Sequence, residues 1–313
     1  VGTLGASAAL AAMALVRGEA GYALVLLAAE IVAALVLYDA AFAAVVQIAG
    51  SAARRTITHI TLIAGFASTV FWPLTALLLE HLPWRAIYLL YARLNLIVCL
   101  PVHALLLPRR PPGPSIPAAT VGAVAATPAP PPPQAFWLLA LSFAATAYVV
   151  GAIPAQMVPL LHGAGFGDAA HWLGSLLGPA QVAIRVVEAT VMQRFSPVLV
   201  ALVAAVLPPL AAAALLFGAP HIVAGMLFAI AFGAGSGLNS IVRGTLPLAL
   251  FGPVGYGALL GRLAVVGRAT ASFAPFAFAV LAERWSLSAA LVSAIVAGLA
   301  GVLPLFLLRH RLR

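Results

Sequence analysis

The sequence predicts an all-α, polytopic membrane protein built as a helical bundle. Hydrophobic residues make up 64% of the 313 residues, whereas charged residues make up only 7%. The mean hydropathy is +1.13, far above that of a soluble domain. Apolar runs of about 20 residues recur, and a helix of that length crosses a hydrocarbon core of about 30 Å. Membrane strands of about ten alternating residues do not match these runs.

Ten spans are predicted along the chain, at residues 1–17, 21–48, 57–79, 86–107, 136–161, 170–192, 197–217, 221–243, 256–281 and 286–308. One long connection, residues 108–135, contains ten prolines and little that could pack, which is typical of a flexible linker. We therefore expect a helical part at 1–107, a linker at 108–135 and a six-helix part at 136–313.

The arginines predict how the chain crosses the membrane. The chain has no lysine and a net charge of +9. Ten arginines fall on the side of the linker: Arg54, Arg55, Arg109, Arg110, Arg194, Arg243, Arg262, Arg309, Arg311 and Arg313. Three fall on the other side: Arg17, Arg85 and Arg284. Since loops rich in arginine stay inside, we expect the linker and the C-terminus in the cytoplasm of a bacterial inner membrane. Scattered arginines of this kind do not indicate nucleic-acid binding.

The sequence contains no signature of an enzyme. It lacks the nucleophile-elbow, Walker, metalloprotease and paired-cysteine motifs, so we expect no enzyme, no metal and no cofactor. His162 and His171 stand nine residues apart, a spacing that does not place two ligands on one helical face. We expect both histidines to be solvated in a loop.

Charges inside the spans are candidates for a functional site, because a charge at mid-membrane is costly. Arg185 and Glu188 lie within one helical turn, on an inward-facing stripe that comprises Gly174, Gly178, Gln181, Arg185 and Glu188. Two interpretations stay open. Either the pair braces helix packing and the glycines allow close approach, or Arg185 binds an anionic substrate or a gate carboxylate.

Two acidic residues, Glu30 and Asp39, share the second predicted span. Nine residues separate them, or about 900° at 100° per residue, so a straight helix would turn them to opposite faces. Asp39 lies nearer mid-depth and is the better candidate for a protonatable coupling group. The alternative is a structural bond from Asp39 to a neighbouring helix.

The remaining candidates are polar residues spread over four other spans. Asn239 needs partners in a dry site and can line a cavity, whereas Arg243 on the same stripe can reach the interface. Pro154 and Pro159 predict an interruption of the span 136–161. Arg93 faces away from Asn95, so only one of the two can line a cavity. The substrate or coupling candidates are Asp39, Glu30, Arg93, Asn95, Tyr148, Gln156, Gln181, Asn239 and Arg268, and the gate or packing candidates are Arg185, Glu188, Arg243 and Arg262.

Two stretches carry a resemblance to a known family. Residues 50–85, "GSAARRTITHITLIAGFASTVFWPLTALLLEHLPWR", and residues 253–285, with a glycine-rich entry and Pro275, resemble the fifth and eleventh helices of the major facilitator superfamily. "IRVVE", residues 184–188, is similar to the family's G-R-x-x-D motif at the end of the eighth helix. The resemblance implies two six-helix halves, of which the first two helices are missing here, and a bracing role for Arg185 and Glu188 at a cytoplasmic gate.

The resemblance implies a secondary transporter that works by alternating access. We expect a small anionic or amphiphilic solute and a lipid bilayer as partners, protons as the coupling ion, no nucleic acid and a monomer. The alternatives are a non-transporting membrane protein, including the remnant of a truncated transporter, and a membrane-embedded enzyme.

Overall fold

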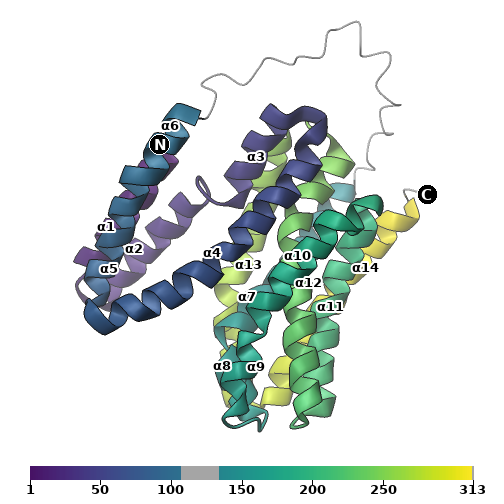
Figure 1. Ribbon diagram of the computed structural model, residues 1–313. Helices are drawn as coiled ribbons and strands as arrows, with labels where there is room; N and C mark the ends of the chain where they lie inside the picture. The colour runs from purple at the N-terminus through teal and green to yellow at the C-terminus, as the bar shows by residue number, and fades with distance from the viewer. Residues whose placement is uncertain (107–133, 312–313) are drawn as a thin grey trace, which may run out of the picture. The chain divides into compact units, whose positions relative to one another are not determined.

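The computed structural model describes the backbone of residues 1–106 and 134–311, and their side chains except at 68, 69, 72, 73, 76 and 311; these ranges contain helices and no strand (Figure 1). The chain forms two compact units. The N-terminal unit comprises Val1–Ala53 and Ala67–Ala126, and the C-terminal unit comprises Arg54–Phe66 and Thr127–Arg313. The boundary falls inside helix α4 (Ala53–His81), so residues 54–66 belong to the C-terminal unit. The predicted linker at 108–135 lies almost wholly outside the described residues.

Seven described segments are long and apolar enough to cross a membrane: Gly18–Ala67, Trp84–Leu106, Ala135–Ala155, Pro197–Gly218, Ile222–Phe251, Tyr256–Arg284 and Leu287–His310. The protein is therefore an integral, multi-pass membrane protein, as the sequence predicts. The first predicted span is a shorter apolar helix, α1 (Gly2–Leu15).

In the N-terminal unit, α1 packs on α2 (Gly18–Ala33) and α5 (Trp84–Leu94). Beyond α5 the chain widens into a π-helical turn, η2 (Asn95–Cys99), and continues as α6 (Leu100–Leu106). Pro101 explains the wide turn, because proline donates no backbone hydrogen bond and its ring crowds the carbonyl four residues earlier. Thr3 of α1 and His103 of α6 are joined by a 2.9 Å hydrogen bond between Oγ1 and Nδ1.

The second predicted span is not one helix. It divides into α2 and α3 (Tyr38–Ala49), with turns at residues 34–37 between them. Neither glycine nor proline stands in this break, which is why the apolar run predicted a continuous helix. Glu30 and Asp39 consequently lie on different helices, and the prediction that they occupy opposite faces of one straight helix is wrong.

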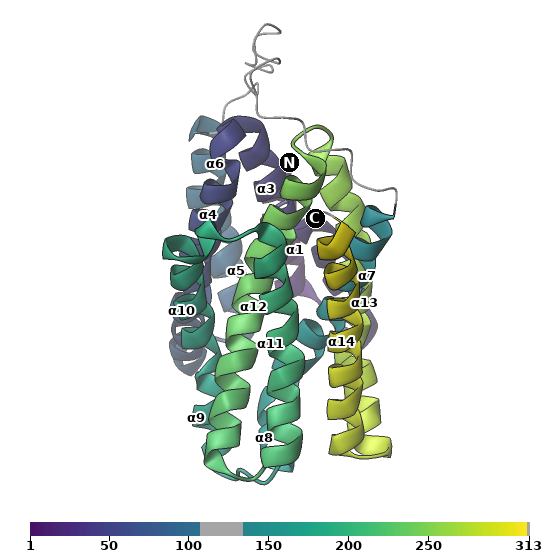
Figure 2. The same cartoon turned by 90° about the vertical axis from the view of Figure 1, so that its right-hand side faces the viewer.

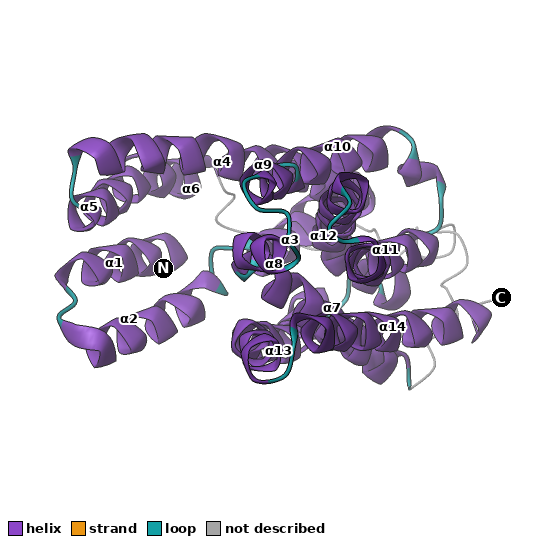
Figure 3. Cartoon of the chain, turned by 90° about the horizontal axis from the view of Figure 1, so that it is seen from below, coloured by secondary structure: helices purple, strands orange, loops and turns teal. Residues whose placement is uncertain are grey.

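The C-terminal unit contains α7 (Ala135–Ala155), α8 (Met157–Gly163), α9 (Ala169–Ser175), α10 (Leu177–Thr190), the short η4 (Met192–Arg194), α11 (Pro197–Gly218), α12 (Ile222–Phe251), α13 (Tyr256–Arg284) and α14 (Leu287–Arg311). The main packed pairs run in the order α10, α12, α11, α14, α7 and α13, each against the next (Figure 3). Short connections make neighbours such as α11 and α12 antiparallel (Figure 2). Large apolar side chains, including Phe228, Phe232 and Phe278, fill the interior.

Two glycines of α12 set the distance between α12 and α10. A Cβ at Gly233 would stand 2.7 Å from the Leu177 carbonyl oxygen, and a Cβ at Gly237 would stand 2.8 Å from that of Gln181. The two backbones therefore touch, as small residues allow in membrane helices. A Cβ at Gly178 would meet nothing within 4 Å. The expectation that the glycine at 178 permits close approach is wrong, because the glycines that do so belong to α12.

Two further predicted spans are interrupted. Pro154 and Pro159 flank the junction of α7 and α8 at Gln156, which confirms the predicted interruption. The predicted span 170–192 divides at Leu176 into α9 and α10. At both junctions the backbone N–H bonds to the carbonyl three residues earlier, to Ile153 from Gln156 and to Leu173 from Leu176, so the chain tightens for one turn.

Candidate functional site

The most deeply buried charges of the C-terminal unit lie on α10. Arg185 is 6% exposed and Glu188 is 1% exposed. Removing an ion from water costs on the order of several kcal/mol unless polar partners replace the water. The partners therefore decide what these two residues can do, and they come from the first half of α4.

One face of α4 is lined by small polar residues and glycine. Arg54, Thr58, Thr61 and Gly65 follow at intervals of four, three and four residues, which keeps them within about 60° of one another around the helix. Thr58 and Thr61 are both 0% exposed. The Thr61 hydroxyl donates to the Thr58 carbonyl oxygen at 2.8 Å, so it is satisfied within the helix and needs no partner from another helix.

Glu188 is held by this face of α4. The Thr58 hydroxyl hydrogen-bonds the Glu188 carboxylate and lies 3.4 Å from the Arg54 carbonyl oxygen, and the Arg54 guanidinium acts on the carboxylate from the same helix. Within the described residues, the second carboxylate oxygen, Oε2, has no hydrogen-bond partner. The carboxylate is thus buried, is hydrogen-bonded at one oxygen, and is compensated by the positive charge of Arg54 on a different helix.

Arg185 lies one helical turn away and meets the same face at Gly65. Its Nη1 occupies the space where a side chain at position 65 would begin, and its Cδ lies 3.4 Å from that point. Gly65 is itself buried. Only a residue without a side chain leaves room for the guanidinium here, so the pairing of Gly65 with Arg185 fixes how α4 and α10 meet.

A third contact closes the cluster at the end of α10. Arg54 donates from Nη2 to the carbonyl oxygen of Phe195 at 3.0 Å, just beyond η4. Three contacts, from Arg54, Thr58 and Gly65, therefore join the first half of α4 to α10 and the turn that follows it. We call these six residues, Arg54, Thr58, Gly65, Arg185, Glu188 and Phe195, the α4–α10 brace.

The remaining candidates on α10, α12 and α13 are half-buried. Gln181 donates to the Ser236 hydroxyl of α12 at 3.4 Å, one turn from the brace. Asn239, Arg243 and Arg268 are also partly buried, whereas Arg262 is exposed. The polar stripe of α10 thus continues from the brace onto α12.

Two candidates mark α7. Tyr148 shares a 2.9 Å hydrogen bond with Ser293 of α14, which ties these two helices together. Gln156 forms the junction between α7 and α8 and is partly buried. Neither residue belongs to the brace.

The candidates of the N-terminal unit are more open. Asp39 and Asn95 are partly buried, and Glu30 and Arg93 are exposed. Elsewhere in this unit an open cleft of about 520 Å³ is lined by Val16, Gly18, Glu19, Tyr22, Trp84, Arg85 and Tyr88. Arg85 stacks 4.4 Å from the Trp84 ring centroid and donates to the Val16 carbonyl oxygen. Aromatic and arginine side chains at the ends of membrane helices are typical of interface anchors.

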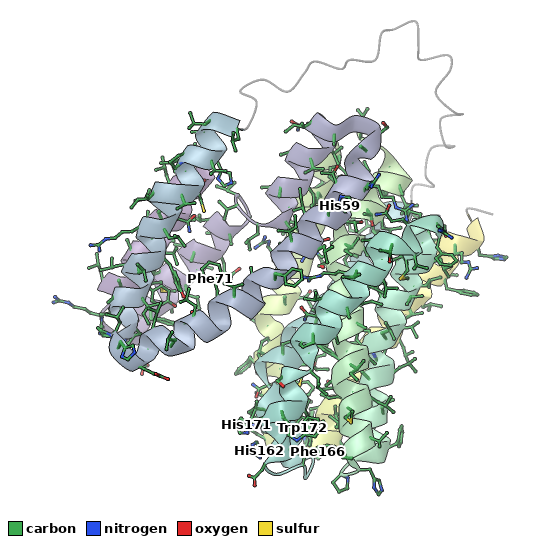
Figure 4. The ribbon with its side chains drawn as sticks, viewed as in Figure 1. His59, Phe71, His162, Phe166, His171 and Trp172 are labelled. Carbon is green, nitrogen blue, oxygen red and sulfur yellow. The ribbon has the colours of Figure 1, made fainter. Side chains whose placement is uncertain are left out.

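Sequence reasoning missed the α4 side of the brace and one histidine pair. Thr58, Thr61 and Gly65 carry a signal, small residues at helical spacing, but nothing local says which helix they meet. His162 and His171 are exposed, as expected, but they lie on α8 and α9 rather than in a loop, and their rings lie 5.3 Å apart, centroid to centroid. They meet because α8 and α9 form a hairpin (Figure 4), so their spacing on a single helix was the wrong criterion.

Comparisons with known proteins identify the fold. No known family profile matches the sequence, and no curated protein matches it. Sixteen solved chains resemble the structure. One is the crystal structure of the human organic anion transporter MFSD10 (TETRAN), with a TM-score of 0.69 and 21% identity over 98% of this chain and 75% of that chain. The chain therefore has the fold of a major facilitator superfamily transporter, as the sequence resemblance implies.

Proposed function

We propose that this protein is a secondary transporter that carries a small organic solute across the membrane by alternating access. The observation that carries the proposal is the likeness of nearly the whole chain, 98% of it, to a transporter of the major facilitator fold. In that fold a site near the midplane opens to each side in turn as helical blocks rock against each other. The buried charges of the C-terminal unit supply polar groups of the kind such a path needs.

The proposed solute is an organic anion or an anionic amphiphile. The similar solved structure is that of an organic anion transporter. The partly buried charges and amides of this chain also favour an anion, because Arg268, Gln181 and Asn239 offer hydrogen-bond donors. We assign these three residues, together with Tyr148 and Gln156, to the lining of the path.

The proposed role of the α4–α10 brace is that of a gate contact. Its charges lose water when α4 and α10 meet and regain it when the helices part. Its two states therefore differ by the exchange of the Thr58–Glu188 hydrogen bond for water. Such an exchange is nearly balanced, with a net contribution of about 1 kcal/mol per hydrogen bond. Arg243 and Arg262 are assigned to packing at the same gate.

The proposed coupling groups are Asp39 and Glu30, the acidic residues of α3 and α2. A proton on a carboxylate removes the charge that makes exposure to the membrane interior costly. Asp39 is the better candidate because it is partly buried, whereas Glu30 is exposed. Arg93 and Asn95 are kept as candidates on the neighbouring segment.

Uptake into proteoliposomes tests the proposal. We expect purified protein to accumulate one or more members of a panel of radiolabelled organic anions above the level of empty liposomes, and to do so faster under a proton gradient. Asp39→Asn should abolish the stimulation by the gradient while leaving the folded yield unchanged. Glu283→Gln, at an exposed helix end, is the matched control and should transport normally.

Each other outcome decides a specific point. Unchanged stimulation in Asp39→Asn removes Asp39 from the mechanism. Uptake of neutral or cationic solutes alone would contradict the anion assignment. If no solute of any charge is taken up by a folded protein, the chain is a non-transporting membrane protein, and turnover of a panel of hydrolase and transferase substrates would make it a membrane enzyme instead.

A further inference from the structure

The α8–α9 hairpin places two imidazole rings side by side on an exposed surface of the C-terminal unit. His162 lies in the last turn of α8, and His171 lies in the first turn of α9. Their ring centroids are 5.3 Å apart and their planes are inclined by 76°. Figure 4 shows both residues at the same end of the unit, near Phe166 and Trp172. Both imidazoles are exposed, so an ion from solution can reach them.

The backbone of the hairpin is built to hold this arrangement. Gly165 and Gly167 have φ angles of +89° and +51°, in the left-handed region that glycine adopts without strain. Gly165 N–H bonds to the His162 carbonyl oxygen at 3.0 Å, and Phe166 N–H bonds to that of Leu161 at 3.2 Å. This pair of bonds is a Schellman motif, which ends α8 sharply and turns the chain back into α9.

The hairpin is also fixed to the rest of its unit. Phe166 is 7% exposed and Leu173 is 0% exposed. Both side chains lie over Gly225 of α12, where an added Cβ would stand 2.7 Å from Leu173 Cδ1 and 2.9 Å from Phe166 Cε1. The Cα positions of the two histidines are therefore set by one buried anchor in the turn and one on α9, so binding requires little further ordering of the backbone.

We infer that His162 and His171 form a binding site for a divalent transition-metal ion of the zinc type. A tetrahedral zinc ion about 2.0 Å from one nitrogen of each ring places the two ring centroids about 5 Å apart. The observed separation of 5.3 Å matches this geometry. Imidazole nitrogen suits zinc and copper(II), whereas magnesium and calcium prefer oxygen ligands.

The hairpin supplies two ligands. Within the part of the chain that the structure describes, no group of three or more histidine, cysteine, aspartate or glutamate residues could hold a metal. Water completes the coordination, so the site remains open and exchangeable rather than closed like a structural zinc site. Binding joins the end of α8 to the start of α9 and stabilises the hairpin by an amount that rises with the metal concentration relative to Kd.

The test uses the full chain, purified in detergent with a tag that contains no histidine. Zn²⁺ alone is titrated by calorimetry, and we expect one saturable site. His162→Ala and His171→Ala should each weaken binding at least about tenfold. Loss of a group that only hydrogen-bonds a metal ligand already costs that much at other sites, and loss of a ligand should cost no less. His221→Ala is the matched control. His221 is exposed, and it follows Pro220, whose Cβ would stand 3.3 Å from a Cβ added at Gly165, so it lies near the hairpin.

Electron paramagnetic resonance with Cu²⁺ counts the ligands directly. We expect hyperfine structure from two imidazole nitrogens in the wild type and in His221→Ala, and from one in each of the other single variants. The inference is wrong if either histidine variant binds Zn²⁺ within threefold of the wild type, or if His221→Ala weakens binding equally. A one-nitrogen spectrum in the wild type also overturns it. Thermal unfolding without metal should be the same in all four proteins, because the three histidines are exposed.

Discussion

Two sets of intramembrane charges, one in each unit, lie in opposite environments. Arg185 and Glu188 of the C-terminal unit are 6% and 1% exposed, whereas Glu30 and Arg93 of the N-terminal unit are exposed. All four stood out in the sequence for the same reason, a charge in an apolar run. The difference lies in the partner helix, since α4 offers Thr58 and Gly65 to the first pair. A charged residue in an apolar helix is therefore buried where a neighbouring helix presents small or polar residues to it.

The apolarity of a segment does not decide whether the segment is buried. The segment Gly18–Ala67 has a mean hydropathy of 2.3 in its most apolar window, and none of that window is buried. The segment Pro197–Gly218 has a mean hydropathy of 2.5, and 61% of its window is buried. Hydropathy reports transfer into the membrane, whereas burial depends on side chains small enough for backbones to touch.

The largest effect is expected where α12 touches α10. Gly237→Ala places a Cβ 2.8 Å from the Gln181 carbonyl oxygen and forces the helices apart, which should lower the free energy of unfolding by about 3 kcal/mol. Gly178→Ala is the control on the facing helix, since nothing lies within 4 Å, and it should be neutral or stabilising. Thermal unfolding in detergent measures both. Equal losses in the two variants would show that α10 and α12 do not touch at their backbones.

A smaller loss is expected from the buried carboxylate. Glu188→Ala removes the acceptor for Thr58 and the charge that faces Arg54, so the free energy of unfolding should fall by about 2 kcal/mol. Glu188→Gln retains an oxygen for the Thr58 hydroxyl and should lose less. The same unfolding measurement applies, and a Gln variant as unstable as the Ala variant would mean that charge, not hydrogen bonding, stabilises the brace.

Thr58→Val tests the hydrogen bond alone. The two side chains have nearly the same shape, so only the hydroxyl is lost, and the expected decrease is about 1 kcal/mol. Combining Thr58→Val with Glu188→Ala in a double-mutant cycle gives the coupling energy between the two positions. Strict additivity of the two losses would contradict a direct contact.

The smallest effect is expected in the N-terminal unit. Arg93→Gln alters an exposed side chain and should change the free energy of unfolding by less than about 0.5 kcal/mol. Normal unfolding together with lost anion uptake would assign Arg93 to the transport path. A loss as large as that of Glu188→Ala would remove the contrast between the two pairs of charges.

The sequence predicts the helical, membrane-spanning class and the burial of charge on α10, because both follow from apolar length and helical spacing. It also predicts the break at Gln156, since Pro154 and Pro159 mark it. The break at residues 34–37 carries no such mark. The contact of Thr58 with Glu188 joins residues 130 positions apart, and only the folded bundle brings them together. Similarly, the meeting of His162 and His171 depends on the angle of a turn.

The paired junctions at Gln156 and Leu176 have one more consequence. Each replaces a regular helical bond by a tighter one, and they lie at the two points where the α8–α9 hairpin joins the rest of the unit. Leu177, directly beyond the second junction, packs closely against Gly233 of α12. Because Phe166 and Leu173 hold the hairpin on α12, strain at these two joints would end at residue 177 and would not shear α10 along α12.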